Sequence, residues 1–378
     1  MLVLVLCFLV SAVLTLCLVR LGRGKWAQSA DHDFSGPQKF HSVVVPRVGG
    51  VGIAFSVLIG AIYADQVQGQ GATLLGFTLM VCAIPAFAAG LLEDLTKTIS
   101  ARWRLLATAV SALAAYWLLD AQLRHTGIPG LDWLVAIPVG SLFLTVFAVA
   151  GIANSVNIID GFNGLASMCV VIMLAALCYV GFQVGDILVA TLALAGIGAV
   201  LGFFIWNFPA GMIFLGDGGA YFLGFLVAEL SILLLVRNPT VSPLFPLLVC
   251  VYPVFETLFS IYRRKFLRAV PPSMPDGIHL HSLIYRRVMR WAVGNRSAKS
   301  LTYRNSMTSP YLWALCILSV VPAVLFWDNT MLLAFSLGLF GVSYVVLYWR
   351  IVRFKSPYWL RFVPSRAPWA AEADNEPR

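Results

Sequence analysis

The sequence has little charge: Asp, Glu, Lys and Arg make up only 11% of its 378 residues, whereas 60% are hydrophobic. Soluble domains carry about 25% charged residues, so this composition excludes an ordinary soluble domain. The formal net charge of +9 could suggest a nucleic-acid partner. The distribution of the basic residues argues instead for membrane orientation and an anionic substrate, with no nucleic acid bound.

Other familiar patterns are also missing. Each of the seven cysteines lies inside an apolar run and no pair has zinc or redox spacing, so we interpret them as small packing residues. The N-terminal apolar run lacks the basic start and the cleavage site of a signal peptide, which predicts a membrane helix that is retained. No inverted internal repeat of the kind found in many transporters is recognisable.

Long apolar runs account for most of the chain. A membrane-spanning helix needs about 20 mainly apolar residues, and this criterion predicts an all-α, polytopic bundle of eleven spans in a catalytic domain of residues 1–354. The spans are expected at residues 2–20, 48–66, 73–91, 103–120, 133–153, 164–182, 186–205, 214–236, 241–262, 310–327 and 331–349. Residues 263–309 are predicted to form a cytoplasmic loop with an interfacial amphipathic helix, and residues 355–378 a cytoplasmic tail.

The basic residues orient this bundle. If the N-terminus is periplasmic, all but two of the 26 Lys and Arg residues fall on one side, and the exceptions are Arg124 and Arg237. Because Lys and Arg accumulate in cytoplasmic loops, the basic side and the C-terminus are predicted to be cytoplasmic.

Five polar segments lie on the same side: QKFHSVVVPRVGG, GLLEDLTK, NSVNIIDGFNGLA, FLGDGG and HLHS. The third is the most informative, because Asn154, Asn157, Asp160 and Asn163 recur every three residues. Helix capping would use one or two of these side chains, not four. Polar side chains at membrane depth are usually functional, so this segment predicts a site.

The first two segments allow a simpler interpretation. Lys39 and Arg47 could anchor the chain at the membrane surface. Glu93 and Asp94 could be helix-end charges, with Asp94 paired to Lys97 one turn later. The functional alternative is a carboxylate pair for a proton or a metal, with cations for a phosphate.

The last two segments carry an acid and two histidines. Asp217 could be a helix N-cap, but the glycines beside it would also expose it to Mg²⁺, which binds one or two carboxylates together with phosphate oxygens. His279 and His281, two residues apart, suit a phosphate better than a shared metal. Glu229 and Glu256 lie within spans and need partners that the sequence does not identify.

Together, the side chains of the predicted cytoplasmic face are those of phosphoryl transfer, in which positioning and charge stabilisation dominate catalysis. Carboxylates would hold Mg²⁺, cations would bind phosphate, and asparagines would bind a base or sugar. A site at the membrane boundary suggests that one substrate is a lipid and the other a cytoplasmic nucleotide derivative. A cation-coupled transporter or lipid flippase is the alternative from another class.

The five segments occur in the order and spacing of the polyprenyl-phosphate N-acetylhexosamine-1-phosphate transferases (glycosyltransferase family 4), which the chain resembles over about residues 39–290. The resemblance implies transfer of N-acetylhexosamine 1-phosphate from a UDP-sugar to undecaprenyl phosphate, with release of UMP. It further implies a multi-pass protein of the bacterial inner membrane, with Mg²⁺ as cofactor and Mn²⁺ as a substitute, and it allows a homodimer.

The resemblance assigns roles to particular residues. Asp217 matches the metal ligand. The matched catalytic residues are Glu93, Asp94, Asp160, His279 and His281. The matched substrate-binding residues are Lys39, Arg47, Lys97, Asn154, Asn157 and Asn163.

Three positions depart from the family's pattern. Glu93 and Asn163 stand where many members have Asp, so residue 163 cannot form a covalent intermediate, and Ser282 stands where some members have a further His. These departures favour the initiation of cell-surface polysaccharide synthesis, such as that of O-antigen lipopolysaccharide. They disfavour the phospho-N-acetylmuramoyl-pentapeptide transferase of peptidoglycan synthesis.

Overall fold

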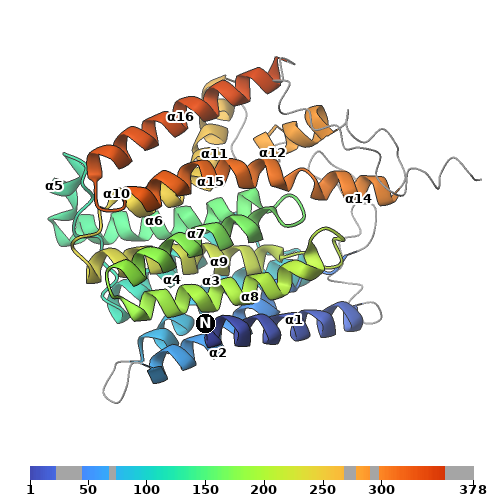
Figure 1. The fold of residues 1–378 in the computed structure, drawn as a ribbon, viewed down its shortest axis with the longest axis horizontal. Helices are drawn as coiled ribbons and strands as arrows, with labels where there is room; N and C mark the ends of the chain where they lie inside the picture. The colour runs from blue at the N-terminus through green and yellow to red at the C-terminus, as the bar shows by residue number, and fades with distance from the viewer. Residues whose placement is uncertain (23–44, 68–73, 268–277, 290–297, 354–378) are drawn as a thin grey trace, which may run out of the picture.

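The computed structural model describes residues 1–22, 45–67, 74–267, 278–289 and 298–353 (Figure 1). These residues form helices and connecting turns, which confirms the predicted all-α class. The helices are α1 (Leu2–Gly22), α2 (Gly49–Val67), α3 (Leu75–Thr96), α4 (Ala101–Leu118), α5 (Leu131–Val135), α6 (Pro138–Ile159), α7 (Leu165–Gln183), α8 (Ile187–Asn207), α9 (Gly216–Arg237), α10 (Leu244–Val249), α11 (Val251–Tyr262), α12 (Leu280–Leu283), α14 (Ala298–Ser306), α15 (Ser309–Leu325) and α16 (Thr330–Val352). Two π-helical turns, η1 (Arg263–Leu267) and η2 (Ile284–Val288), continue α11 and α12.

Within the described residues, nine helical stretches are long and apolar enough to cross a membrane, so the protein is a polytopic membrane protein. The other two predicted spans correspond to α4 and to the pair α10–α11. Two arginines in its first turn make α4 less apolar. The predicted span at residues 241–262 is broken after Val249, because Pro253 has no N–H to donate to the carbonyl one turn earlier. The count of eleven spans stays a prediction.

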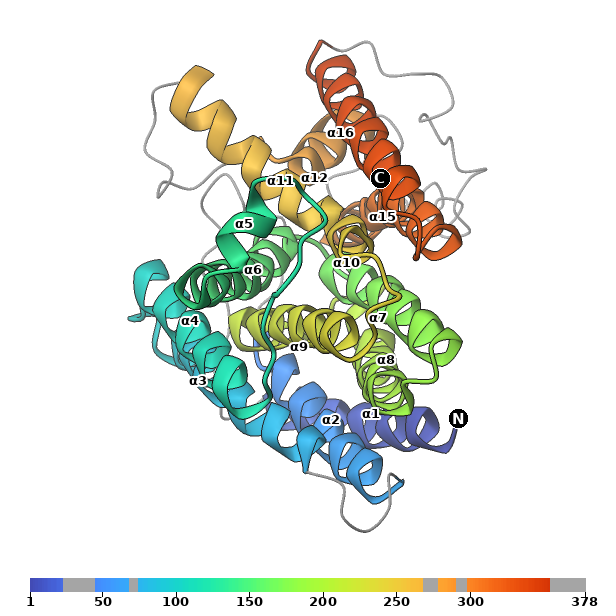
Figure 2. The ribbon, with the colours of Figure 1, turned by 90° about the vertical axis from the view of Figure 1, so that its left-hand side faces the viewer.

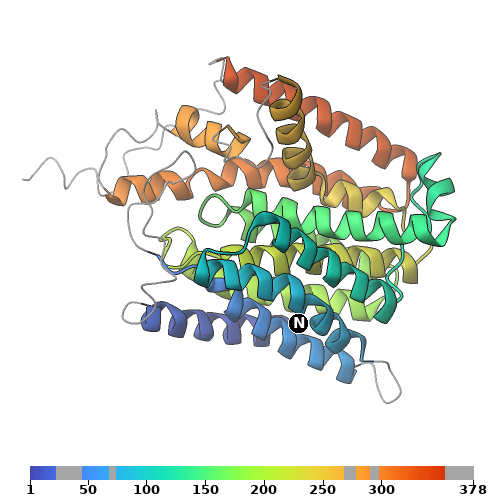
Figure 3. The ribbon, with the colours of Figure 1, turned by 180° about the vertical axis from the view of Figure 1, so that it is seen from behind.

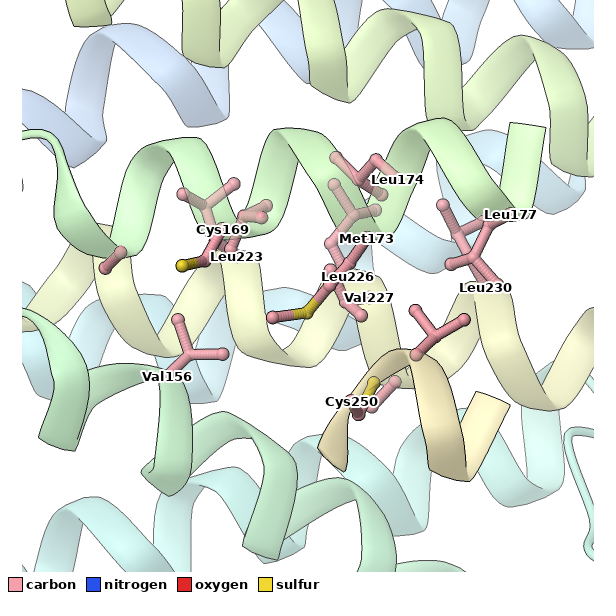
Figure 4. Close-up of a cluster of buried hydrophobic side chains, with 14 of the residues drawn as sticks. Val156, Cys169, Met173, Leu174, Leu177, Leu223, Leu226, Val227, Leu230 and Cys250 are labelled. Atoms are coloured by element: carbon pink, nitrogen blue, oxygen red, sulfur yellow. The ribbon is translucent and has the colours of Figure 1, made fainter. Parts of the chain in front are cut away.

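Helix α9 forms the centre of the bundle. Every residue from Gly216 to Leu234 is buried, as expected for a helix that is apolar on all sides. Figure 2 shows α9 surrounded by α3, α6, α7 and α8. The core between α7 and α9 contains Met173, Leu177, Leu226 and Leu230 (Figure 4).

A short main-chain junction joins the start of α2 to the start of α9. The amides of Gly49 and Gly50 donate to the carbonyls of Phe214 and Leu215, and the amide of Phe214 donates to the carbonyl of Pro46. These bonds bring Arg47 beside Asp217, although the two residues are 170 positions apart in the sequence.

Several connections and short helices gather at one end of the bundle. The α6–α7 and α8–α9 connections lie there beside α12 and α14 (Figures 1 and 3). The segment predicted to be an interfacial amphipathic helix begins here as α12 and η2. Its apolar residues Leu280, Leu283, Ile284 and Val288 are buried inside the protein, so within the described part this face contacts protein, which corrects the interfacial placement.

Candidate active site

A cavity of about 330 Å³ opens at this end of the bundle. It is lined by residues from the end of α6, the start of α9, the α6–α7 and α8–α9 connections and the segment before α2, and by residues at α8, α12 and α14. The lining includes seven of the predicted site residues, namely Arg47, Asn157, Asp160, Asn163, Asp217, His279 and His281. Four of the five polar sequence segments therefore meet at one place.

Asp217, in the first turn of α9, has the densest charge contacts of the site. Its Oδ1 lies 3.2 Å from Nη2 of Arg47, and its Oδ2 pairs with Arg104 of α4. Arg47 also reaches the buried carboxylate of Asp94, with Nε 3.4 Å from Oδ1. Arg104 lies over the ring of Tyr221, one turn further along α9. Two acids and two arginines thus form one network at the cavity.

The backbone at the start of α9 is shaped to bring these groups together. Gly216 has φ +78°, and a Cβ at this position would lie 2.6 Å from Oδ2 of Asp94 and 2.3 Å from the carbonyl oxygen of Arg47. The amide of Gly218 donates to Oδ2 of Asp94 at 2.9 Å. Because only glycine combines this conformation with so close an approach, the FLGDGG segment positions Asp94 as well as Asp217.

Asp160 follows the last residue of α6 and lines the cavity beside Asn157. In the described part of the structure its carboxylate accepts no hydrogen bond and forms no ion pair. Desolvation raises the pKa of Asp160 to about 7, an effect that Arg47 opposes and Asp94 reinforces. A carboxyl group that titrates near neutral pH inside a cavity is typical of a functional group.

The two histidines form a stacked pair, with ring centroids 5.1 Å apart and an interplanar angle of 13°. The ring of His281 lies edge-on to Phe162 and close to Gly161, where a Cβ would be 3.2 Å from Nε2. His279 contacts Glu256 through Nδ1. Both histidines line the cavity.

Asn163 lines the cavity but is also an anchor for α14. Its amide nitrogen Nδ2 donates to Ser306 Oγ at 3.1 Å, and its backbone N–H donates to Asn305 Oδ1 at 2.9 Å. Its carbonyl accepts from Ser309 Oγ at 2.6 Å. The side chain is therefore held by protein, whereas Asn157 and Asp160 line the cavity without such bonds to other described residues.

The remaining predicted residues lie elsewhere. Asp94 lies beneath Asp217, and Glu93 accepts from the amide of Ile99 at 2.7 Å, which holds the α3–α4 turn. Asn154 accepts from the hydroxyl of Tyr221 at 3.2 Å, one turn below the cavity. Lys97 ends α3 in the left-handed conformation, with φ 58°. The predicted substrate-binding residue Lys39 lies outside the described residues.

Two site residues were not predicted from the sequence. In the sequence Arg104 is only a basic charge near the end of a predicted span, although in the structure it pairs with Asp217. Glu256 stood out as an acid in need of a partner, and the structure provides His279. Both partners are distant in the sequence, so no local pattern could have identified these pairs.

The donor set fits a magnesium ion that is shared with a phosphate. Among the described residues, no three His, Cys, Asp or Glu side chains come together as a metal cage. Mg²⁺ needs no such cage, because one or two carboxylates, water and substrate phosphates complete its shell. Asp217 at the cavity supplies one carboxylate. Oδ1 of Asp94 is buried and, among the described residues, has the ion pair with Arg47 but no hydrogen bond. Arg47 and Arg104, which now contact Asp217, could pair with the phosphate.

The fold and the site together define a class of protein: a polytopic helical membrane protein with a cavity at one end of the bundle that is lined by Asp160, Asp217 and Arg47. The sequence matches the model of "Glycosyl transferase family 4" over residues 76–235.

Individual similar proteins carry related names. The chain is 29% identical to a "Probable undecaprenyl-phosphate N-acetylglucosaminyl 1-phosphate transferase" of Bacillus subtilis, over 79% of this chain and 81% of that protein. It is 29% identical to the "Undecaprenyl-phosphate alpha-N-acetylglucosaminyl 1-phosphate transferase" of Thermotoga maritima, over 67% and 72%. It is 28% identical to the "Phospho-N-acetylmuramoyl-pentapeptide-transferase" of Streptococcus thermophilus, over 71% and 80%.

Proposed function

We propose that the protein transfers N-acetylhexosamine 1-phosphate from a UDP-sugar to undecaprenyl phosphate. An oxygen of the lipid phosphate attacks the β-phosphorus of the UDP-sugar and forms a new P–O bond. The bond between that phosphorus and the bridging oxygen breaks, and UMP leaves with the bonding electrons. One phosphoanhydride replaces another, so the reaction needs no further energy source.

The observation that carries this proposal is the convergence of Asp217, Asp160 and Arg47 with the two histidines on one cavity at the end of a membrane bundle. A soluble nucleotide can enter from the aqueous side, while a lipid phosphate arrives at the membrane boundary. A transporter would instead place such groups near the midplane, on broken helices.

Each side chain of the site has a role that follows from its chemistry. Arg47 and Arg104 bind and neutralise phosphate oxygens, and Asn157 satisfies donors and acceptors of the nucleotide or sugar. Asp160 faces the reacting phosphates as a carboxylate that can hold a proton near neutral pH. Asp217, with Asp94 behind it, would hold Mg²⁺, which stabilises charge on the transferred phosphoryl group. The lipid phosphate is already largely dianionic above its second pKa of about 6, so little is required of a base.

We also propose where the protein is located and in which pathway it acts. The Lys and Arg distribution favours a bacterial inner membrane with the cavity facing the cytoplasm. The named relatives that transfer N-acetylglucosamine 1-phosphate and the residues at positions 93 and 163 support an initiating step of surface polysaccharide synthesis, such as O-antigen lipopolysaccharide.

The experiment is a transfer assay with purified protein in detergent, undecaprenyl phosphate, Mg²⁺ and a panel of radiolabelled UDP-sugars. The panel contains UDP-GlcNAc, UDP-GalNAc, deoxy-N-acetylhexosamine derivatives and UDP-N-acetylmuramoyl-pentapeptide. We expect label in the lipid fraction and an equal amount of UMP with at least one N-acetylhexosamine. If no sugar gives UMP release, the proposed transferase activity is rejected. If only UDP-N-acetylmuramoyl-pentapeptide is a substrate, the protein acts in peptidoglycan synthesis instead.

A further inference from the structure

Glu256 is a buried carboxylate, only 1% exposed, on α11 behind the cavity. It accepts three hydrogen bonds. Nδ1 of His279 lies 2.9 Å from Oε1, the backbone amide of Leu280 lies 3.1 Å from the same oxygen, and the hydroxyl of Tyr344 on α16 lies 2.5 Å from Oε2. A buried carboxylate is costly unless such donors surround it, so this arrangement holds three segments together.

The contact between Glu256 and His279 fixes the tautomer of the imidazole ring as well as its position. A carboxylate only accepts hydrogen bonds, so opposite the ionised form of Glu256 the proton of the imidazole lies on Nδ1. A carboxylate bonded to one ring nitrogen thereby sets the tautomer and the orientation of the other nitrogen. His279 lines the cavity, so any contact that its ring makes with a cavity ligand goes through Nε2.

We propose that Glu256 is a positioning residue, which orients His279 so that its Nε2 contacts a phosphate of the nucleotide substrate. The contact could not be read from the sequence, where 23 positions separate the two residues. Glu256, His279 and Tyr344 also lie beyond residues 76–235, which match the family model. The phosphate contact rests on the proposed function, whereas the ring orientation does not.

A purely structural role for Glu256 is the competing explanation, since it links α11 to α12 and α16. The chain offers a matched control in Glu229, another fully buried glutamate, on α9. Glu229 lies twelve residues from Asp217, which corresponds to about 18 Å along the helix. Glu229→Gln therefore removes a buried acid from the same protein without touching the site.

The deciding experiment is a double-mutant cycle of Glu256→Gln and His279→Ala. If Glu256 acts through His279, the first variant lowers kcat/KM by about 10- to 100-fold, the range typical of groups that orient a functional histidine. The double variant should be no slower than His279→Ala alone, because residues that act as a unit are non-additive. Glu229→Gln should keep the kcat/KM of the unmodified protein.

Additive losses in the cycle, or equal losses for Glu256→Gln and Glu229→Gln, overturn the proposal. If Glu256→Gln fails to fold, Tyr344→Phe takes its place in the cycle. It removes one donor from Glu256 without touching His279, and the same non-additivity with His279→Ala is expected.

The ring orientation has a readout that is independent of catalysis. In protein carrying ¹⁵N-labelled histidine, with signals assigned against His279→Ala, we expect His279 to carry its proton on Nδ1 and Glu256→Gln to perturb that signal. A proton on Nε2 alone overturns the inference even in an active protein. A protein that releases no UMP with any sugar rejects the proposed function and the phosphate contact with it, while the nitrogen signals still decide the orientation.

Discussion

The carboxylate of Asp217 lies between the guanidinium groups of Arg47 and Arg104, which come from the segment before α2 and from α4. The sequence identified the acid through its flanking glycines, and it identified Arg47 as a cation near a membrane boundary. It could not identify Arg104 as a partner, because the contact depends on how α4 packs beside α9.

Asp217→Asn should lower kcat/KM by about 100-fold or more. The amide cannot replace a carboxylate that holds a divalent cation, whose stabilisation of the transferred phosphate is worth several kcal/mol. Initial rates of UMP release over a range of Mg²⁺ concentrations measure the effect, with size-exclusion chromatography as the check on folding. Full turnover by this variant would remove Asp217 from the metal role.

The rate should depend on pH through Asp160. Its pKa is raised to about 7, so the group is neutral below this pH and a carboxylate above it. If the ionised form is needed, kcat/KM rises as pH increases through about 7. In Asp160→Asn the rise of kcat/KM around pH 7 should vanish. Only the pH dependence from titration of the lipid phosphate, near its second pKa of about 6, should remain. Rates measured from pH 5.5 to 8.5 that are identical in shape for both proteins would contradict the role.

The amide of Asn163 is matched to the hydroxyl that it contacts. The hydroxyl of Ser306 donates to the carbonyl of Pro209 at 2.6 Å, and its oxygen accepts from Nδ2 of Asn163. Asn163→Asp would replace the donor by an acceptor and should reduce the free energy of unfolding by about 1–3 kcal/mol. Thermal unfolding in detergent measures this. Adding Ser306→Ala should recover part of the loss, and a fully additive double variant would argue against the contact.

At the scale of elements, the apolar runs predicted the positions of the helices well, because a membrane helix must satisfy its own backbone hydrogen bonds and therefore leaves a long apolar signature. Irregular backbone was harder to predict. The break between α10 and α11 comes from Pro253 inside an otherwise apolar run, whereas the burial of α12 and η2 depends on neighbouring helices. For the same reason, an amphipathic pattern alone could not show whether its apolar face contacts lipid or protein.

The junction of α2 with α9 depends on the absence of side chains at the crossing. A Cβ at Gly50 would lie 2.3 Å from Cα of Gly219, so Gly50→Ala should push the helices apart and cost about 1–3 kcal/mol of stability. Gly338→Ala is the matched control, since a Cβ there meets no atom within 4 Å. The yield of folded protein and the unfolding midpoint compare the two, and equal midpoints would contradict the close contact.

At the scale of the whole molecule, orientation and the crossing of α4 can be tested together. Thr98 and His125 are exposed and flank α4 at opposite ends. With a membrane-impermeant thiol reagent, His125→Cys should label in intact cells, whereas Thr98→Cys should label only after permeabilisation. Unmodified protein, which contains the exposed Cys17, provides the background. The reverse pattern would invert the orientation, and labelling of both positions from outside would show that α4 does not cross.

The sequence by itself determined the fold class, and it singled out seven of the residues that line the cavity at one end of the bundle. Burial in lipid and the asymmetry of basic residues act on each segment separately, so they can be read from local composition. Only the tertiary structure decided which residues meet: Arg104 with Asp217, Asn163 with Ser306, and Glu256 with His279. These contacts join segments distant in the chain, and their geometry depends on how the helices pack rather than on any one of them.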